Sequence, residues 1–352
     1  MHRYLLFFNY RGTNFRGSQK LLSRKDSEIL TKQTLLEEEK TVQGALETGL
    51  KLALTPSNPP VFFLSSRTDT GVHAYSSTGT VDLIHPKPDK YFSPLEITQH
   101  LNHHFIKRNL EVRINRTLAV HPDFRARKDT IAREYLYQLA VSSEEIPPYP
   151  FKRYKRRRNN NKIFMPSQLP VFMADRYLQI GHNVFDAEKI ESCLKMMEGS
   201  HNFRNFCSST GWIKHLKLPD GSHLSSPRTE EEFIKDISSI DLLESVSPFP
   251  LPELNQYFKF YNIKISGKAF LHNQVRRMVG AALAASSGRM EQDDLKKMLT
   301  KPDLGWDTRA KPVPAHGLHL LSVTYSPESL VNSTEDVKLL PLQPPGSTSE
   351  DV

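Results

Sequence analysis

The segment SSRTDTGVHA at residues 65–74, which follows the apolar run VFFL, holds one carboxylate, Asp69. Gly71 permits backbone conformations that other residues resist, so a loop here can display Asp69 at the end of a strand. Arg67 lies two residues before Asp69. A guanidinium within about 4–6 Å favours the ionised carboxylate, and an ionised carboxylate suits a nucleophile or a general base. The loop therefore indicates one of these two roles for Asp69.

The tripeptide Asp-Thr-Gly would also suit the active-site loop of an aspartic protease. That mechanism needs two carboxylates that share a proton. The chain has no second Asp-Thr-Gly or Asp-Ser-Gly, so the site would require a dimer. Arg67 would oppose proton sharing because it keeps Asp69 charged. The sequence therefore disfavours a protease.

Two other segments combine residue types that packing alone does not demand. Tyr135 and Tyr137 alternate along a predicted strand and point to the same face; for Tyr137 we favour simple sheet packing. Arg276 and Arg277 interrupt an amphipathic helix. A buried arginine requires a charged partner, and Asp69 is a candidate, whereas the alternative is that both arginines extend to solvent.

The periodicity of apolar residues predicts a mixture of strands and helices in two coarse halves. Ser93, Pro94 and Glu96 predict a helix start with a capping box. Antiparallel-looking strands accompany one or two helices in each half, which indicates an α+β fold with helices on one face of each sheet. The predicted strands are 3–10, 61–64, 78–84, 110–120, 133–141, 232–243, 257–267 and 317–325, and the predicted helices are 41–54, 93–105, 186–199, 271–288 and 291–299.

Composition limits the class of protein. The 352 residues allow two domains, and the net charge of +8 with a pI near 9.3 favours a polyanionic partner such as nucleic acid. Two isolated cysteines predict a reducing compartment without a disulfide framework. Neither metal-ligand spacing nor a nucleotide-binding motif is present, so we expect no metal and no cofactor. No apolar run approaches the roughly 20 residues of a membrane span, and the one at the N-terminus is too short for a typical signal peptide.

The run FKRYKRRRNNNK at residues 151–162 concentrates positive charge and predicts a mobile insertion. It could contact phosphates, or it could be a solvated loop or a nuclear-import-like patch. Residues 326–352 are rich in Pro, Ser and acidic residues and predict disorder.

Six segments, in order, resemble the TruA family of pseudouridine synthases. The early NYRGTNFRGSQ and TVQGALE resemble the family's opening motif and first helix. The loop from Arg67 to Ala74 matches Arg-Thr-Asp-x-Gly-Val-His-Ala, and residues 133–137 match Arg-x-Tyr-x-Tyr. Residues 275–280 match Val-Arg-x-Met/Ile-Val-Gly, and residues 317–320 match Gly-Leu-x-Leu. The resemblance runs from residue 3 to residue 325, and QVRRMVG and PAHGLHL look most like the animal members.

The resemblance implies a fold and an activity. The fold would be two ferredoxin/RRM-like α+β halves, with mixed and mostly antiparallel sheets around a central basic cleft. Residues 1–125 would carry the catalytic loop, residues 126–326 would complete the cleft with a basic insertion at 147–168, and residues 327–352 would form a disordered tail. The protein would isomerise uridine to pseudouridine in tRNA or another structured RNA without a metal or cofactor.

The resemblance also assigns roles to single residues. Asp69 would be the catalytic carboxylate that attacks the ribose or removes a sugar proton, and Arg276 would pair with it. Tyr135 would stack on the target base, Leu318 would line the base pocket, and Arg67 would help to extrude the uridine from the RNA stack, at a cost of a few kcal/mol.

The chain departs from the family at Arg11, where Asp is usual, and at Ser18, where Trp is usual. The stretches 20–40, 147–168 and 214–230 look like insertions, which affects the RNA target more than the reaction. The alternative function is a catalytically silent RNA-binding protein or RNA chaperone of the same fold. The resemblance also predicts a mitochondrial location, with cytoplasm or nucleus as alternatives, and allows a homodimer.

Overall fold

The computed structural model describes residues 1–20, 38–143, 168–217, 223–248 and 255–330. The basic run at 151–162 lies outside these residues, as do most of the predicted insertions at 20–40 and 147–168 and most of the predicted tail.

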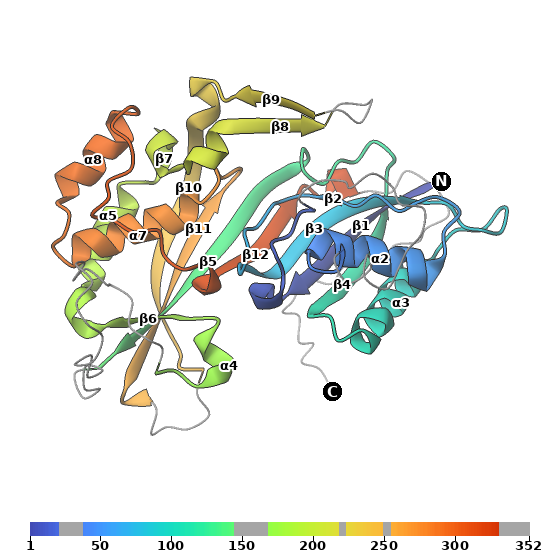
Figure 1. Cartoon of the computed structure of the whole chain (residues 1–352), viewed down its shortest axis with the longest axis horizontal. Coiled ribbons are helices and arrows are strands. Elements are labelled where there is room, and N and C mark those ends of the chain that lie inside the picture. The colour runs from blue at the N-terminus through green and yellow to red at the C-terminus, as the bar shows by residue number, and fades with distance from the viewer. Residues whose placement is uncertain (21–37, 144–167, 218–222, 249–254, 331–352) are drawn as a thin grey trace, which may run out of the picture.

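Ten of the described strands form one sheet (Figure 1). Along its main path the order is β4-β1-β3-β12-β5-β11-β10-β7, while β2 pairs with β3 and β6 pairs with β5. The contacts of β12 with β3 and of β6 with β5 are parallel, and the others are antiparallel, which confirms the predicted mixed, mostly antiparallel α+β fold. The strands are β1 (His2–Tyr10), β2 (Phe63–Leu64), β3 (His73–Leu83), β4 (Val112–Val120), β5 (Thr130–Ser142), β6 (Leu178–Gly181), β7 (Gly199–Asn202), β10 (Ile234–Ser245), β11 (Phe258–Gly267) and β12 (Leu318–Tyr325).

Strand β12, the last one in the described residues, joins the two predicted halves. It pairs with β3 through His319 opposite His73, and with β5 through Leu320 opposite Tyr135. The two predicted sheets are therefore one continuous sheet in the folded chain. The division into domains at 1–125 and 126–326 remains a prediction from the sequence.

Two groups of helices lie along this sheet. Figure 1 shows α2 and α3 by β1, β3 and β4, and α5 and α7 by β10 and β11, with α8 farther out, near β7. The predicted capping box at Ser93 and Glu96 is confirmed. The predicted helix 186–199 begins as expected after Asp186, whose side chain accepts from Lys189 N, but it ends at Lys195. The helices are α2 (Val42–Leu54), α3 (Pro94–Lys107), α4 (Val171–Ala174), α5 (Ala187–Lys195), α7 (Gln274–Ser286) and α8 (Gln292–Thr300).

One cluster of buried apolar side chains, drawn from strands of the sheet and from the helices, forms the main core. It includes most of β1, from Tyr4 to Phe8. The sequence did not indicate β6 or the separate hairpin of β8 (Ile213–Lys217) and β9 (His223–Pro227). Both are short, so their pairing depends on neighbours distant in the sequence rather than on a periodic pattern.

Two buried histidines mark the junction of β3 and β12. The His73 and His319 rings stack with their centroids 4.8 Å apart. Gly12 N donates to His73 Nδ1, so Nε2 carries the proton and donates to Asp175 O at 2.7 Å. Burial lowers the pKa of both rings, and that of His319 falls to about 3. Both histidines are therefore neutral near pH 7.

We expect His319 to make the protein less stable in mild acid. Below pH 6.5 an unfolded chain binds a proton at His319, whereas the folded chain stays neutral down to about pH 3. Its contribution to the free energy of unfolding therefore falls by about 1.4 kcal/mol per pH unit as the pH drops from 6.5. His319→Gln can keep a donor near Arg176 O without titrating, so urea unfolding at pH 7, 6 and 5 should show a flatter dependence. The exposed His103→Gln is the control, and an unchanged slope in His319→Gln would contradict the prediction.

Candidate active site

Asp69 lies in the loop between β2 and β3. Val72 N donates to Asp69 O at 3.1 Å and closes a turn. Gly71 has φ +82°, a conformation that a residue with a side chain rarely adopts. The Asp69 side chain remains 29% exposed. The loop thus leaves the carboxylate partly exposed beyond the end of β2, as the sequence predicted.

The N-terminal segment holds this loop in place through Thr68. Tyr10 and Thr68 share a hydrogen bond between their hydroxyls at 2.7 Å. Ser18 Oγ accepts from Thr68 N at 2.8 Å, and Ser18 N donates to Thr68 O at 3.1 Å. Ser18 is buried, so this small hydroxyl residue, in place of the family's usual Trp, fixes the main chain next to Asp69.

Arg133 ties the same loop to the segment that precedes α7. Its side chain is buried and donates to Ser65 O at 2.7 Å and to Lys268 O. Burial lowers the pKa of its guanidinium. Sequence reasoning noted Arg133 only as part of a motif, because its acceptors are main-chain oxygens that no side-chain pattern reveals.

Two nitrogen-bearing side chains near the start of α7 contact the Asp69 carboxylate. Arg276 Nη1 lies 3.6 Å from Oδ2, and His272 Nε2 lies 3.1 Å from Oδ1. Arg276 is held by Asn273 Oδ1 at 2.7 Å and by Val313 O at 2.7 Å. The structure therefore places Arg276 where the resemblance implied and adds His272, for which the sequence gave no signal.

Arg277 has different partners from Arg276. It donates to Cys207 O at 2.7 Å, and its guanidinium lies 4.8 Å from the centroid of the Trp306 ring. Burial lowers its pKa. Neither arginine simply extends to solvent, and of the two only Arg276 approaches Asp69.

Tyr135 lies close to the Asp69 loop. It is buried, its hydroxyl is 3.0 Å from Ser66 Oγ, and its ring packs edge-on against Phe270. Burial, and to a lesser extent the negative charge of Asp69, raises the pKa of Tyr135, so its phenol stays protonated. Tyr137 is fully buried and donates to Pro314 O at 2.9 Å, which confirms sheet packing as its role.

Leu318 and Arg67 flank this group. Leu318 is buried at the start of β12, opposite Tyr137. Arg67 is exposed, and its pKa is lowered by partial desolvation and then by the positive charges of Arg127 and Arg228. The structure thus gathers Asp69, Tyr135 and Arg276 directly, with the other two predicted residues on the neighbouring strand and in the same loop.

Arg11, the other departure from the family pattern, forms ion pairs within the protein. Its Nε lies 2.6 Å from Asp175 Oδ2, and its Nη1 lies 2.9 Å from Glu111 Oε1. The pairs connect the end of β1 with the residues that precede β4 and follow α4. Its charge is therefore largely balanced locally.

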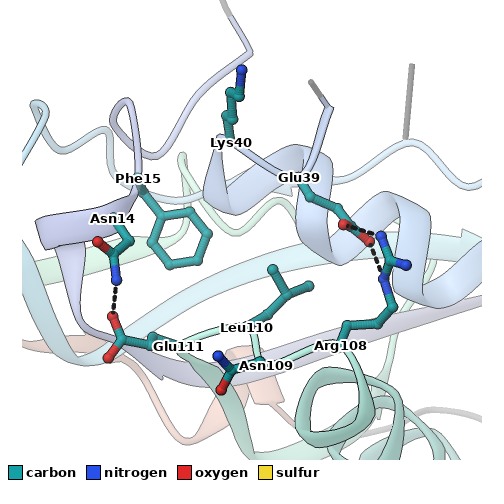
Figure 2. A pocket seen from close by; sticks show the side chains of 8 residues that line it. All are labelled: Asn14, Phe15, Glu39, Lys40, Arg108, Asn109, Leu110 and Glu111. Carbon is teal, nitrogen blue, oxygen red and sulfur yellow. Dashed lines mark hydrogen bonds and ion pairs between the residues drawn. The ribbon is translucent and has the colours of Figure 1, made fainter. Parts of the chain in front are cut away.

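A hollow of about 320 Å³ lies beside the N-terminal segment (Figure 2). The Glu39–Arg108 ion pair lines it, together with the hydrogen bond from Asn14 to Glu111. None of the predicted site residues lines this hollow. In the described ranges, no group of three His, Cys, Asp or Glu side chains could hold a metal ion, and no helix has the length and apolar character needed to cross a membrane.

Comparisons with known proteins agree with the family resemblance that the motifs indicated. Residues 220–326 match the family model for tRNA pseudouridine synthase. The chain is 28% identical over 324 residues to human tRNA pseudouridine synthase-like 1, which covers 92% of this chain and 90% of the human protein. It is also 28% identical over 337 residues to tRNA pseudouridine synthase A of Limosilactobacillus fermentum, which covers 96% of this chain and 100% of that protein.

The same enzyme of Thermus thermophilus is 28% identical to the chain over 330 residues, or 94% of this chain. The matches thus extend well beyond the single region that the family model covers. Together with the six motifs and the mixed α+β sheet, they make the chain similar to tRNA pseudouridine synthases over most of its length.

Proposed function

We propose that this protein is an RNA pseudouridine synthase that isomerises uridine in tRNA or another structured RNA, with Asp69 as its catalytic carboxylate. The observation that carries the proposal is the Asp69 carboxylate in the family's loop motif, held 3.6 Å from the Arg276 guanidinium. The names of the similar proteins support tRNA as the substrate.

The reaction is a redox-neutral isomerisation. The bond between uracil N1 and ribose C1′ breaks, a bond between C5 and C1′ forms, and C5 loses a proton while N1 gains one. Asp69 can attack the ribose or remove and return a sugar proton, and both routes need an ionised carboxylate. The role we assign to Arg276 is to hold this carboxylate in place through their ion pair.

The remaining predicted residues suit the handling of the base. The buried, protonated Tyr135 provides a ring for stacking and a phenol that can donate a proton. Leu318 would line the base pocket. Arg67 is exposed on the catalytic loop and would offset part of the few kcal/mol that unstacking the uridine costs. The central basic cleft, the mitochondrial location and a homodimer are further proposals that rest on the family resemblance.

We expect Asp69→Asn to fold and bind RNA but to form no pseudouridine. Pseudouridine mapping by chemical tagging and sequencing would compare cells with and without the protein, and knockout cells rescued with each variant. Asp82→Asn is a matched control, because Asp82 also pairs with an arginine, Arg3, at 2.7 Å but lies elsewhere on β3. Sites restored by wild type and Asp82→Asn only would support the proposal.

Restoration of the same sites by Asp69→Asn would refute the catalytic role. If no site depends on the protein although it binds RNA, the catalytically silent RNA-binding protein becomes the better interpretation.

We expect Arg276→Lys to lower kcat by about 10-fold or more, since each 1.4 kcal/mol of lost transition-state stabilisation is tenfold. Lysine keeps the charge but cannot contact Asp69, Asn273 and Val313 O together. Arg277→Lys is the matched control, which should mainly reduce thermal stability, because Arg277 packs on Trp306. Equal loss of kcat in both variants would contradict a specific role for Arg276.

A further inference from the structure

We propose that His272 is a positioning residue for this reaction, which holds the Asp69 carboxylate in its reactive orientation. The inference rests on the proposed function. The His272 Nε2 to Asp69 Oδ1 distance is 3.1 Å, shorter than the 3.6 Å from Arg276 Nη1 to Oδ2. Histidine therefore makes the closer contact with the carboxylate.

The hydroxyls behind the ring set its hydrogen bonding. His272 Nδ1 lies within hydrogen-bond distance of Ser208 Oγ and 3.1 Å from Thr210 Oγ1. When a hydroxyl donates to Nδ1, the neutral ring carries its proton on Nε2 and donates to Asp69. When the ring is protonated, Nδ1 donates to a hydroxyl and Nε2 still donates to Asp69. The arrangement thus presents Asp69 with a donor in both ionisation states.

The main chain also fixes His272. Ser208 N donates to His272 O at 3.2 Å. The short helix η4 (Ser209–Trp212) packs so closely that a Cβ on Gly211 would lie 2.8 Å from His272 Cβ. Gly211 is therefore required for this packing, which holds the imidazole against the Asp69 loop.

The contact between His272 and Asp69 contributes little to the stability of the fold. Their side chains are 40% and 29% exposed, and exposed ion pairs contribute little. The contact matters more for the orientation of the Asp69 carboxylate than for the stability of the fold. Arg276 Nη1 approaches Oδ2 and His272 Nε2 approaches Oδ1, so together they restrict rotation of the carboxylate. Fixed orientation of a reacting group lowers the barrier, and a small misplacement costs rate.

The test compares His272→Leu, which removes the donor, with His272→Gln, whose amide can donate to Asp69 without titrating. The assay would measure kcat and KM by tritium release from a tRNA transcript labelled at uridine C5, chosen from the mapped sites. We expect His272→Leu to lower kcat by about 10- to 100-fold with KM within about twofold. His272→Gln should recover most of the loss, and both variants should melt near the wild-type temperature.

Three results would overturn the inference: an unchanged kcat in His272→Leu, a higher KM with normal kcat, or equal losses of kcat in both variants with lower melting temperatures. The second would indicate an RNA contact and the third a structural role. Wild type and Asp69→Asn are assayed in parallel. Failure of wild type to release tritium would refute the proposed function itself, whereas active wild type with active His272→Leu refutes only the role of His272.

Discussion

The site depends on the insertion of β12 between β3 and β5. Parallel pairing of β12 with β3 requires a long crossover connection, and here most of the C-terminal half lies between the two strands. Neighbouring strands lie about 4.8 Å apart, so Tyr135 on β5 lies two strands, or roughly 10 Å, from Ala74 on β3. This spacing lets the loop before β3 meet both the Tyr135 hydroxyl and the start of α7.

Close approaches of the main chain then set the position of Arg276. A Cβ on Gly280 would lie 2.1 Å from Lys311 O, so only glycine allows residues 311–313 to pass so near to α7. From there Val313 O accepts from Arg276 Nε, and Val313 N donates to Arg276 O. The guanidinium is thereby oriented by the chain that leads into β12, which couples the ion pair with Asp69 to the same strand that joins the sheet.

Local patterns in the sequence predicted the local features well. The capping box at Ser93, the buried strand β1 and the glycine turn after Asp69 follow from neighbouring residues, and the structure has each of them. The continuous sheet and the contact of His272 with Asp69 could not be predicted in this way, because they join residues some 200 positions apart and depend on tertiary packing. Residue types alone offered Asp69 as a candidate partner for a buried Arg276 or Arg277, and the family motif singled out Arg276.

Net charge was a coarse guide to the partner, and the structure refines it. Arg11 is balanced by two carboxylates within the protein, so it adds little to the attraction of a polyanion. Near the Asp69 loop, in contrast, Arg67 is affected by the positive charges of Arg127 and Arg228, which together with desolvation lower its pKa. Like charges held close together raise the free energy of the protein, and bound phosphates would lower it. The local excess of positive charge at the Asp69 loop therefore supports an RNA partner more directly than the total charge does.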